Sequence, residues 1–231
     1  MFINKIGQYH LDYGINNQDY GFECNSADNR IVKCVLDGCS EGEHSEVGVK
    51  LYAFYLERYI KFNVTVNKRT LITRHYDKLL WSILSDMTVY EDVNLMLNYF
   101  CFTIVNCFEF DDQFRVDSLG DGCIILQKHD DTIEFVELKN RNEGNEYLVY
   151  NFIDPKYLTD YKDGVEVIHN YFSKEEYKNV GVATDGVRYI LDNSVLKDEF
   201  KQLLLKGKEN MIKLFINRNQ KVLQDDITIA F

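Results

Sequence analysis

Residues 30–53, RIVKCVLDGCSEGEHSEVGVKLYA, change from a strand pattern to a helix pattern within one short stretch. Alternate apolar side chains predict a strand over 30–36, which runs directly into Asp37-Gly38. A polar loop follows, and apolar residues then recur at three- and four-residue spacing over 46–62. The stretch therefore predicts a strand that ends at an acid, a small polar loop and a long helix.

The patterns on either side of this stretch predict the remaining elements. Strands are predicted over 20–24, 95–110, 113–119, 122–128, 132–138, 164–169, 178–184 and 225–231. Helices are predicted over 69–86, 194–206 and 208–221, and a polar, Tyr-rich surface excursion over 139–163. The hairpin-length links between the central strands favour antiparallel pairing over βαβ units. We expect residues 1–231 to form a single α+β domain in which helices cover the faces of sheets.

Composition and charge narrow the classes of protein that the chain can represent. Its 231 residues include 16 Tyr and 15 Phe, which supply more buriable surface than a disordered chain carries. The net charge of −11 and the lack of a Lys/Arg cluster argue against nucleic-acid binding, because phosphates must be neutralised by positive charge. No window has the roughly 20 apolar residues that span a bilayer. We therefore expect neither a nucleic-acid partner nor a membrane partner.

The cysteines and the first residues indicate a reducing compartment. The six Cys stand at positions 24, 34, 39, 101, 107 and 123, without a CxxC pair, so the spacing does not predict a zinc knuckle. The opening sequence MFINKIGQYHLDYG lacks the basic and apolar regions of a signal peptide. We expect reduced cysteines in the core and a cytoplasmic protein.

Acidic residues stand at the ends of several predicted strands. Asp37-Gly38 and Asp185-Gly186 follow strands, Asp225-Asp226 opens the last strand, and Asp19 comes just before the first. If these carboxylates converge, they repel one another unless cations lie between them, and hard ions such as Mg²⁺ or Mn²⁺ prefer oxygen ligands. The alternative is ordinary turn chemistry, because Asp-Gly is a common turn dipeptide.

Five short motifs, in order along the chain, resemble those of a known family. They are IGQYHLDYGINNQDYGF (6–22), IVKCVLDGCSEGEHSEVGVKLYA (31–53), VDSLGDGCIIL (116–126), GVATDGV (181–187) and QDDITIAF (224–231). Together they are similar to the metal-dependent serine/threonine phosphatases of the PP2C or PPM family, in a divergent bacterial branch. The resemblance covers nearly the whole chain. It implies a four-layer α-β-β-α sandwich, with two central antiparallel sheets flanked by helix pairs, in agreement with the predicted α+β arrangement.

The resemblance also implies a set of metal ligands, made of the acids at strand ends, one adjacent carbonyl and one acid in a hairpin turn. The set is Asp19, Asp37, Gly38, Asp121, Asp185 and Asp225. Asp37 would bridge two Mn²⁺ or Mg²⁺ ions, while Asp185 and Asp225 would complete that binuclear site. Asp19 would reach a metal through water, and Asp121 would help to hold a third, weaker ion, as in bacterial members.

The activity that the resemblance implies is hydrolysis of phosphoserine and phosphothreonine in a phosphorylated protein substrate, through a metal-bridging hydroxide. Two neighbouring cations lower the pKa of a water and neutralise the phosphoryl charge, so that no amino-acid nucleophile is needed. A cognate serine/threonine kinase is the partner that such an activity implies. Two alternatives stay open: a catalytically silent module that binds a phosphoprotein, and a metal-dependent hydrolase of small phosphate esters.

The chain departs from the better-known members at four positions, Gly14, Gln18, Cys39 and Tyr189: Gln18 replaces the usual Glu, and Tyr189 stands where third-metal sites often have another acid. Gly14 stands where they carry a phosphate-holding Arg, and Cys39 stands where many carry a catalytic His. His10 and His44 are candidates for the proton donor or the phosphate contact, and an ordinary loop or surface position is the alternative for each. Cys39 does not predict a cysteine phosphatase, because SEGEHSEV follows it and that mechanism needs a Cys-x5-Arg cradle.

Overall fold

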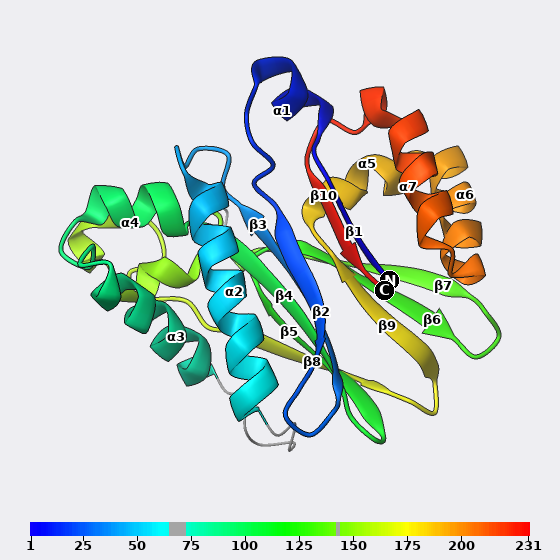
Figure 1. Cartoon of the computed structure of the whole chain (residues 1–231), viewed down its shortest axis with the longest axis horizontal. Coiled ribbons are helices and arrows are strands. Elements are labelled where there is room, and N and C mark those ends of the chain that lie inside the picture. Colours follow the sequence, from blue (N-terminus) through cyan, green and yellow to red (C-terminus); the bar gives the residue numbers. More distant parts are fainter. Residues whose placement is uncertain (65–72, 142–143) are drawn as a thin grey trace.

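Two five-stranded antiparallel sheets stack on each other in the computed structural model, which describes residues 1–64, 73–141 and 144–231 (Figure 1). The first sheet has the order β1 (Phe2–Lys5), β10 (Ile227–Ala230), β9 (Tyr177–Ala183), β6 (Gly122–Lys128) and β7 (Ile133–Leu138). The second has the order β2 (Tyr20–Asn25), β3 (Ile31–Gly38), β4 (Phe102–Glu109), β5 (Gln113–Leu119) and β8 (Ile168–Ser173). Every neighbouring pair is antiparallel, as the short links predict.

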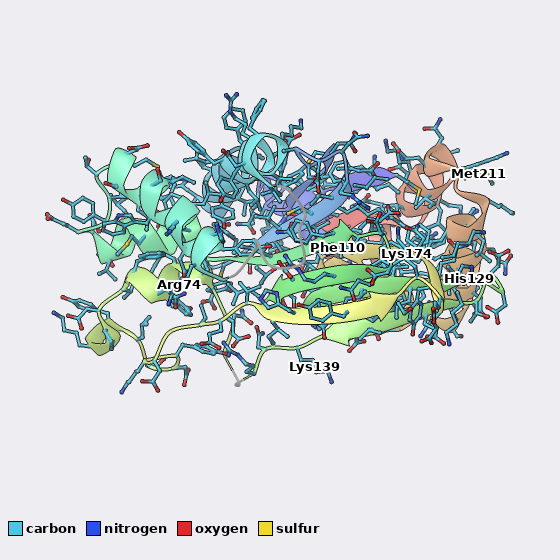
Figure 2. All side chains as sticks on the ribbon, turned by 90° about the horizontal axis from the view of Figure 1, so that it is seen from below. Arg74, Phe110, His129, Lys139, Lys174 and Met211 are labelled. Atoms are coloured by element: carbon cyan, nitrogen blue, oxygen red, sulfur yellow. The ribbon has the colours of Figure 1, made fainter. Side chains whose placement is uncertain are left out.

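Helices lie on the two outer sides of the stacked sheets (Figures 1 and 2). The helices beside the second sheet are α2 (Ser45–Asn63), α3 (Thr73–Asp86) and α4 (Val93–Phe100), and those beside the first are α5 (Arg188–Leu191), α6 (Ser194–Lys206) and α7 (Glu209–Arg218). A short helix α1 (Gln8–Tyr13) follows β1, and 3₁₀ turns η1 (Leu148–Phe152), η2 (Pro155–Tyr157), η3 (Asp185–Val187) and η4 (Gln220–Val222) lie in the connections. Within the described ranges, every helix is too short or too polar to cross a membrane.

The hydrophobic core forms three layers, one for each contact between neighbouring sheets and helices. Val35 and Val182 belong to the layer between the two sheets. Leu36 packs with Leu56 of α2 on the outer side of the second sheet, and Phe200 of α6 belongs to the cluster on the outer side of the first. Three apolar layers between four layers of secondary structure confirm the predicted α-β-β-α sandwich.

Strand β3 shows how the alternation of side chains sets the position of its terminal acid. Cys34 and Leu36 face α2, whereas Val35 faces the other sheet. Lys33 shares the parity of Val35, and its Nζ donates to the Val180 carbonyl on β9 at 2.8 Å. Because side chains alternate with period two, Asp37 follows the same parity and points into the space between the sheets.

One predicted strand is wrong. Residues 95–110 do not form one long strand, because α4 (Val93–Phe100) precedes β4 (Phe102–Glu109). Asp92 begins the helix, since its side chain accepts a hydrogen bond from the Leu95 N–H at 3.1 Å. Met96 and Phe100 are four residues apart and both are buried, which is the spacing of neighbours on one helix face. The continuous apolar run concealed this helical period.

Other predictions need smaller corrections. The segment 139–163 is not purely a surface excursion, because it carries η1 and η2 and its Leu148 and Val149 are fully buried. The strand predicted over 164–169 begins at Ile168 instead. The helix predicted over 69–86 corresponds to α3, and its predicted first residues lie outside the described residues.

Candidate metal centre

Three strands bring acids to one end of the space between the sheets. β3 ends with Asp37-Gly38, β9 ends shortly before Asp185, and Asp225 comes shortly before β10. These ends surround a cavity of about 200 Å³. Its wall is formed by Asp37, Gly38, Cys39, Ser40, Glu41, Thr103, Asp121, Asn145, Tyr147, Asp185 and Asp225. The structure therefore places five of the six residues predicted as metal ligands around one cavity.

The acids in this wall are close enough to share a cation. Asp37, Asp121 and Asp185 each offer a carboxylate oxygen, and these oxygens lie within 4.8 Å of one another. Gly186 lets the segment that leads into β10 come close, because a Cβ at this position would lie 1.9 Å from the Asp226 carbonyl oxygen. The Asp-Gly dipeptide after β9 thus serves the approach of the two segments that carry Asp185 and Asp225.

Asp19, the sixth predicted ligand, lies behind the cavity rather than in its wall. It is buried, and its Oδ2 accepts a hydrogen bond from the Thr184 hydroxyl at 2.6 Å. The Thr184 oxygen in turn accepts from the Thr228 N–H at 2.9 Å, which ties it to β10. The Asp19 carboxyl also contacts that of Asp37. Asp19 is therefore linked to the cavity by its contact with Asp37, which lies in the wall.

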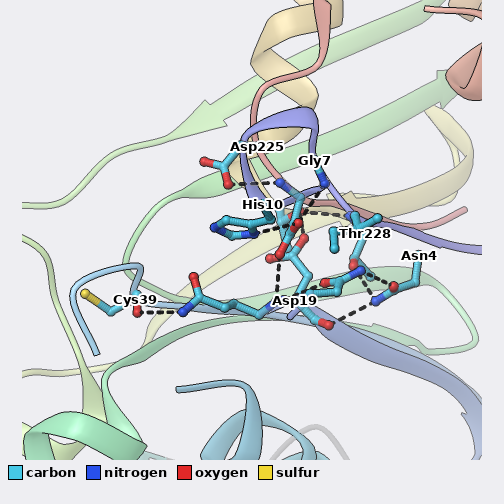
Figure 3. A network of polar contacts seen from close by, with 12 residues as sticks. Asn4, Gly7, His10, Asp19, Cys39, Asp225 and Thr228 are labelled. Carbon is cyan, nitrogen blue, oxygen red and sulfur yellow. Dashed lines mark hydrogen bonds and ion pairs between the residues drawn. The ribbon is translucent and has the colours of Figure 1, made fainter. Parts of the chain in front are cut away.

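His10 and Asp226 form a buried pair beside the cavity (Figure 3). The His10 Nδ1 lies 2.9 Å from the Asp226 Oδ1. The same carboxylate accepts the N–H of Gly7 at 2.7 Å and the N–H of Gln18 at 2.6 Å. Asp226 therefore ties α1 and the loop after it to β10, while the neighbouring Asp225 lines the cavity. The two adjacent acids therefore have different surroundings.

Cys39, one departure from the family pattern, lines the cavity, whereas Gly14 and the candidate His44 lie outside its wall. His44 is exposed just before α2, and its ring centroid lies 5.0 Å from that of Tyr99. Gly14 ends α1 with φ of 67°, a left-handed conformation that glycine adopts without strain. Neither histidine predicted as catalytic is part of the cavity wall. Their catalytic roles stay predictions.

Burial and mutual repulsion raise the pKa values of the clustered carboxyls. Burial is the largest cause for Asp19 and Asp37, whose pKa values lie well above the ordinary range, and neighbouring acids add to it. Burial and then the charge of Asp185 raise the pKa of Asp121 in the same way. The pKa of Asp225 rises to about 6, first through burial and then through Asp185. Without a cation, the cluster therefore retains protons that exposed carboxyls would lose.

We predict that this proton binding makes the stability of the metal-free protein depend on pH. Asp225 has a higher pKa in the folded protein than in the unfolded chain. The stability that its protonated carboxyl gives the folded state is therefore lost as the pH rises from about 4 to above 6. In EDTA, wild type and Asp225→Asn should have similar free energies of unfolding at low pH. Above about pH 6 the variant should be more stable by up to about 3 kcal/mol. Urea unfolding across this pH range measures the difference, and a variant that is less stable at high pH would contradict the prediction.

The donor atoms of the cavity fit a hard divalent cation. Five of its residues are acids, namely Asp37, Glu41, Asp121, Asp185 and Asp225. Such an excess of negative charge repels a phosphate group unless cations compensate for it. Carboxylate and carbonyl oxygens are the ligands that Mg²⁺ and Mn²⁺ prefer.

Some residues at this site were not found from the sequence. Arg188 begins α5, and its guanidinium nitrogens lie 3.7 Å from Asp121 Oδ2 and 3.7 Å from Asp185 Oδ2. The sequence offered one indication of this contact: Arg188 follows Asp185 by three residues, a spacing that makes side chains neighbours in a helical turn. Asn145 and Tyr147 reach the cavity from the segment predicted as a surface excursion, and no local pattern indicated this.

Comparisons with known proteins show the family and the fold of the chain. The family model described as Protein phosphatase 2C matches residues 6–221. The serine/threonine phosphatase Stp1 from Staphylococcus aureus has a similar structure, with a TM-score of 0.68, 15% identity, and coverage of 99% of this chain and 92% of that one. The catalytic domain of the phosphatase PstP, solved in complex with 2 manganese ions, gives 0.57 and 14%, with coverage of 99% and 94%. A comparison with curated proteins gave no match. At these identities the solved structures show a shared fold.

Proposed function

The chain belongs to the protein phosphatase 2C family, and we propose that it is a metal-dependent phosphoprotein phosphatase that hydrolyses phosphoserine and phosphothreonine. The observation that carries the proposal is the convergence of Asp37, Asp185 and Asp225 on one cavity from three separate strand ends. Such a cluster of buried negative charge is costly to fold, so its presence favours a resident cation. A cognate serine/threonine kinase would supply the phosphorylated substrate.

The ligands that we propose for two Mn²⁺ or Mg²⁺ ions follow from these positions. We propose that Asp37, whose carboxyl interacts with both Asp19 and Asp185, bridges the two ions. The ions would be held at the cavity wall by the carbonyl of Gly38 and by the carboxylates of Asp185 and Asp225. When bound, the two ions would lower the pKa of a water and neutralise charge on the phosphoryl oxygens.

The chain's own residues supply orientation around this centre. Thr184 donates a 2.6 Å hydrogen bond to Asp19, and the Asp19 carboxyl in turn contacts that of Asp37. Neutral side chains at the cavity mouth, including Ser40 and Asn145, can donate hydrogen bonds to a phosphate group. We propose that these donors take over part of the role of the Arg that Gly14 replaces.

His10 is the better of the two candidate histidines for a role in proton transfer. Its Nδ1 is directed at Asp226, a pairing that fixes the orientation of the ring next to the segment carrying Asp225 (Figure 3). A neighbouring carboxylate is a common means of orienting a histidine. His44, which is exposed and whose ring is tilted against that of Tyr99, has no such orienting carboxylate among the residues that the structure describes.

The proposal is tested by metal-dependent turnover. We expect the protein to hydrolyse 4-nitrophenyl phosphate and phosphothreonine peptides in the presence of Mn²⁺. EDTA should abolish this activity, and excess Mn²⁺ should restore it. Activity that is unchanged in EDTA would contradict the proposal.

Two other outcomes would favour the alternative functions. Uptake of Mn²⁺ without turnover of any phosphopeptide would indicate a binding module that recognises phosphoproteins. Turnover of small phosphate esters combined with inactivity on phosphopeptides would instead indicate a hydrolase of small molecules. Calorimetric titration with Mn²⁺, together with a panel of phosphopeptides and small esters, separates the three functions.

A further inference from the structure

Arg188 stands at the side of the acid cluster on which Asp121 lies. Its Nη2 is 3.7 Å from Asp121 Oδ2, and its Nη1 is 3.7 Å from Asp185 Oδ2. The Nη2 also donates to the Leu138 carbonyl at 3.4 Å. The guanidinium therefore spans three segments: the turn between β5 and β6, the end of β7 and the start of η3.

The two carboxylates that Arg188 contacts are those that an additional cation on this side would need. Asp121, Asp185 and Asp37 form the triad whose oxygens lie within 4.8 Å of one another. Asp121 also lines a second depression of about 440 Å³, and Arg188 lines the same depression. Arg188 thus shares with Asp121 a depression other than the metal cavity, whose wall does not include Arg188.

A guanidinium at this place has two effects on a cation. It carries a permanent positive charge, which repels a divalent ion at short distance. It also competes for the carboxylate oxygens of Asp121 and Asp185, which such an ion would have to coordinate. The side chain is held by the Leu138 carbonyl and is only 34% exposed, so it is not free to swing into solvent without losing contacts.

We propose that Arg188 takes the place of a third metal ion, so that the chain binds two divalent cations and uses the guanidinium as its third positive charge. The inference rests on the proposed two-metal site. In this inference Asp121 pairs with Arg188 and does not coordinate a metal ion. The inference also makes Arg188 a positioning residue for Asp185, which the proposed binuclear site shares.

Counting bound Mn²⁺ tests this inference without reference to activity. Equilibrium dialysis followed by metal analysis should give two ions per chain for wild type. For Arg188→Ala and Arg188→Gln, we expect a third ion with an affinity at least about tenfold higher than that of any additional ion in wild type. Circular dichroism establishes that each variant is folded, and either variant alone suffices for the comparison.

Three further variants make the count specific. Arg188→Lys keeps the positive charge and should still bind two ions. Lys139→Ala removes an exposed cation (Figure 2) that lines the same depression but makes no ion pair with Asp121 or Asp185 among the described residues. This variant should also bind two ions. Adding Asp121→Asn to Arg188→Ala should remove the third ion again.

The outcomes distinguish this inference from the proposed function. Three ions in wild type, or two in both Arg188→Ala and Arg188→Gln, would overturn the role of Arg188 and leave the two-metal site intact. A third ion that persists in the double variant would also overturn it, because the ion would then lie elsewhere. Wild type that binds no Mn²⁺ would overturn the proposed function together with the inference.

Discussion

Asp37→Asn is expected to lower Mn²⁺-dependent hydrolysis of a phosphothreonine peptide by at least about 1000-fold. Asp37 is the acid in contact with both Asp19 and Asp185, so it is the position best placed to bridge two cations. A neutral amide cannot balance the charge of two ions, and their separation and their effect on a bound water would both change. The measurement is kcat/KM across a range of Mn²⁺ concentrations, which separates weaker metal binding from slower chemistry.

A matched control for this variant is Asp163→Asn, which changes an exposed acid outside the cavity wall. It should retain wild-type kcat/KM, because long-range charge effects at the surface are screened by salt. Asp37→Asn itself should remain folded, since it removes one of the charges that repel one another in the metal-free cluster. A folded Asp37→Asn protein that keeps more than about a tenth of wild-type activity would contradict the role of Asp37.

Asp226→Asn is expected to destabilise the protein by about 3–5 kcal/mol. The Asp226 carboxylate is fully buried and accepts hydrogen bonds from the N–H groups of Gly7 and Gln18, and the His10 Nδ1 lies 2.9 Å from its Oδ1. An amide offers only one acceptor oxygen, and its NH₂ group would face a donor, so at least one buried N–H would lose its partner. Thermal unfolding should show a decrease in Tm on the order of 10 °C.

The adjacent residue provides the control. Asp225→Asn changes the neighbouring acid in the same way, but its side chain lies in the cavity and is repelled by Asp185. In EDTA near neutral pH, Asp225→Asn should therefore raise Tm while Asp226→Asn lowers it. Changes of the same sign in both variants would show that the two acids do not have the separate roles assigned to them.

The fold could be predicted where the side-chain period was unambiguous. The alternation in β3 and the helical spacing of α2, α6 and α7 gave elements close to the observed ones. The prediction failed over 95–110 because nearly every side chain is apolar there, so a helix and a strand leave the same pattern. The cap at Asp92 was the one local signal of a helix, and the apolar run that follows it outweighed that signal.

Only those residues of the candidate site that belong to recognisable sequence motifs could be predicted. The acids at Asp37, Asp185 and Asp225 stand at strand ends, and a doubled sheet brings such ends together. Arg188 and Asp226 owe their roles to partners that are distant in sequence or to the direction of one side chain. Sequence patterns do not encode those directions, and packing between β9, β10 and α1 determines them.

Anomalous scattering from crystals soaked in Mn²⁺ tests the two-cation centre most directly. We predict two manganese peaks in the cavity, both within coordination distance of Asp37, with Asp185 and Asp225 each contacting at least one of them. A cavity without manganese at saturating concentration, or peaks that Asp37 does not touch, would contradict the assignment.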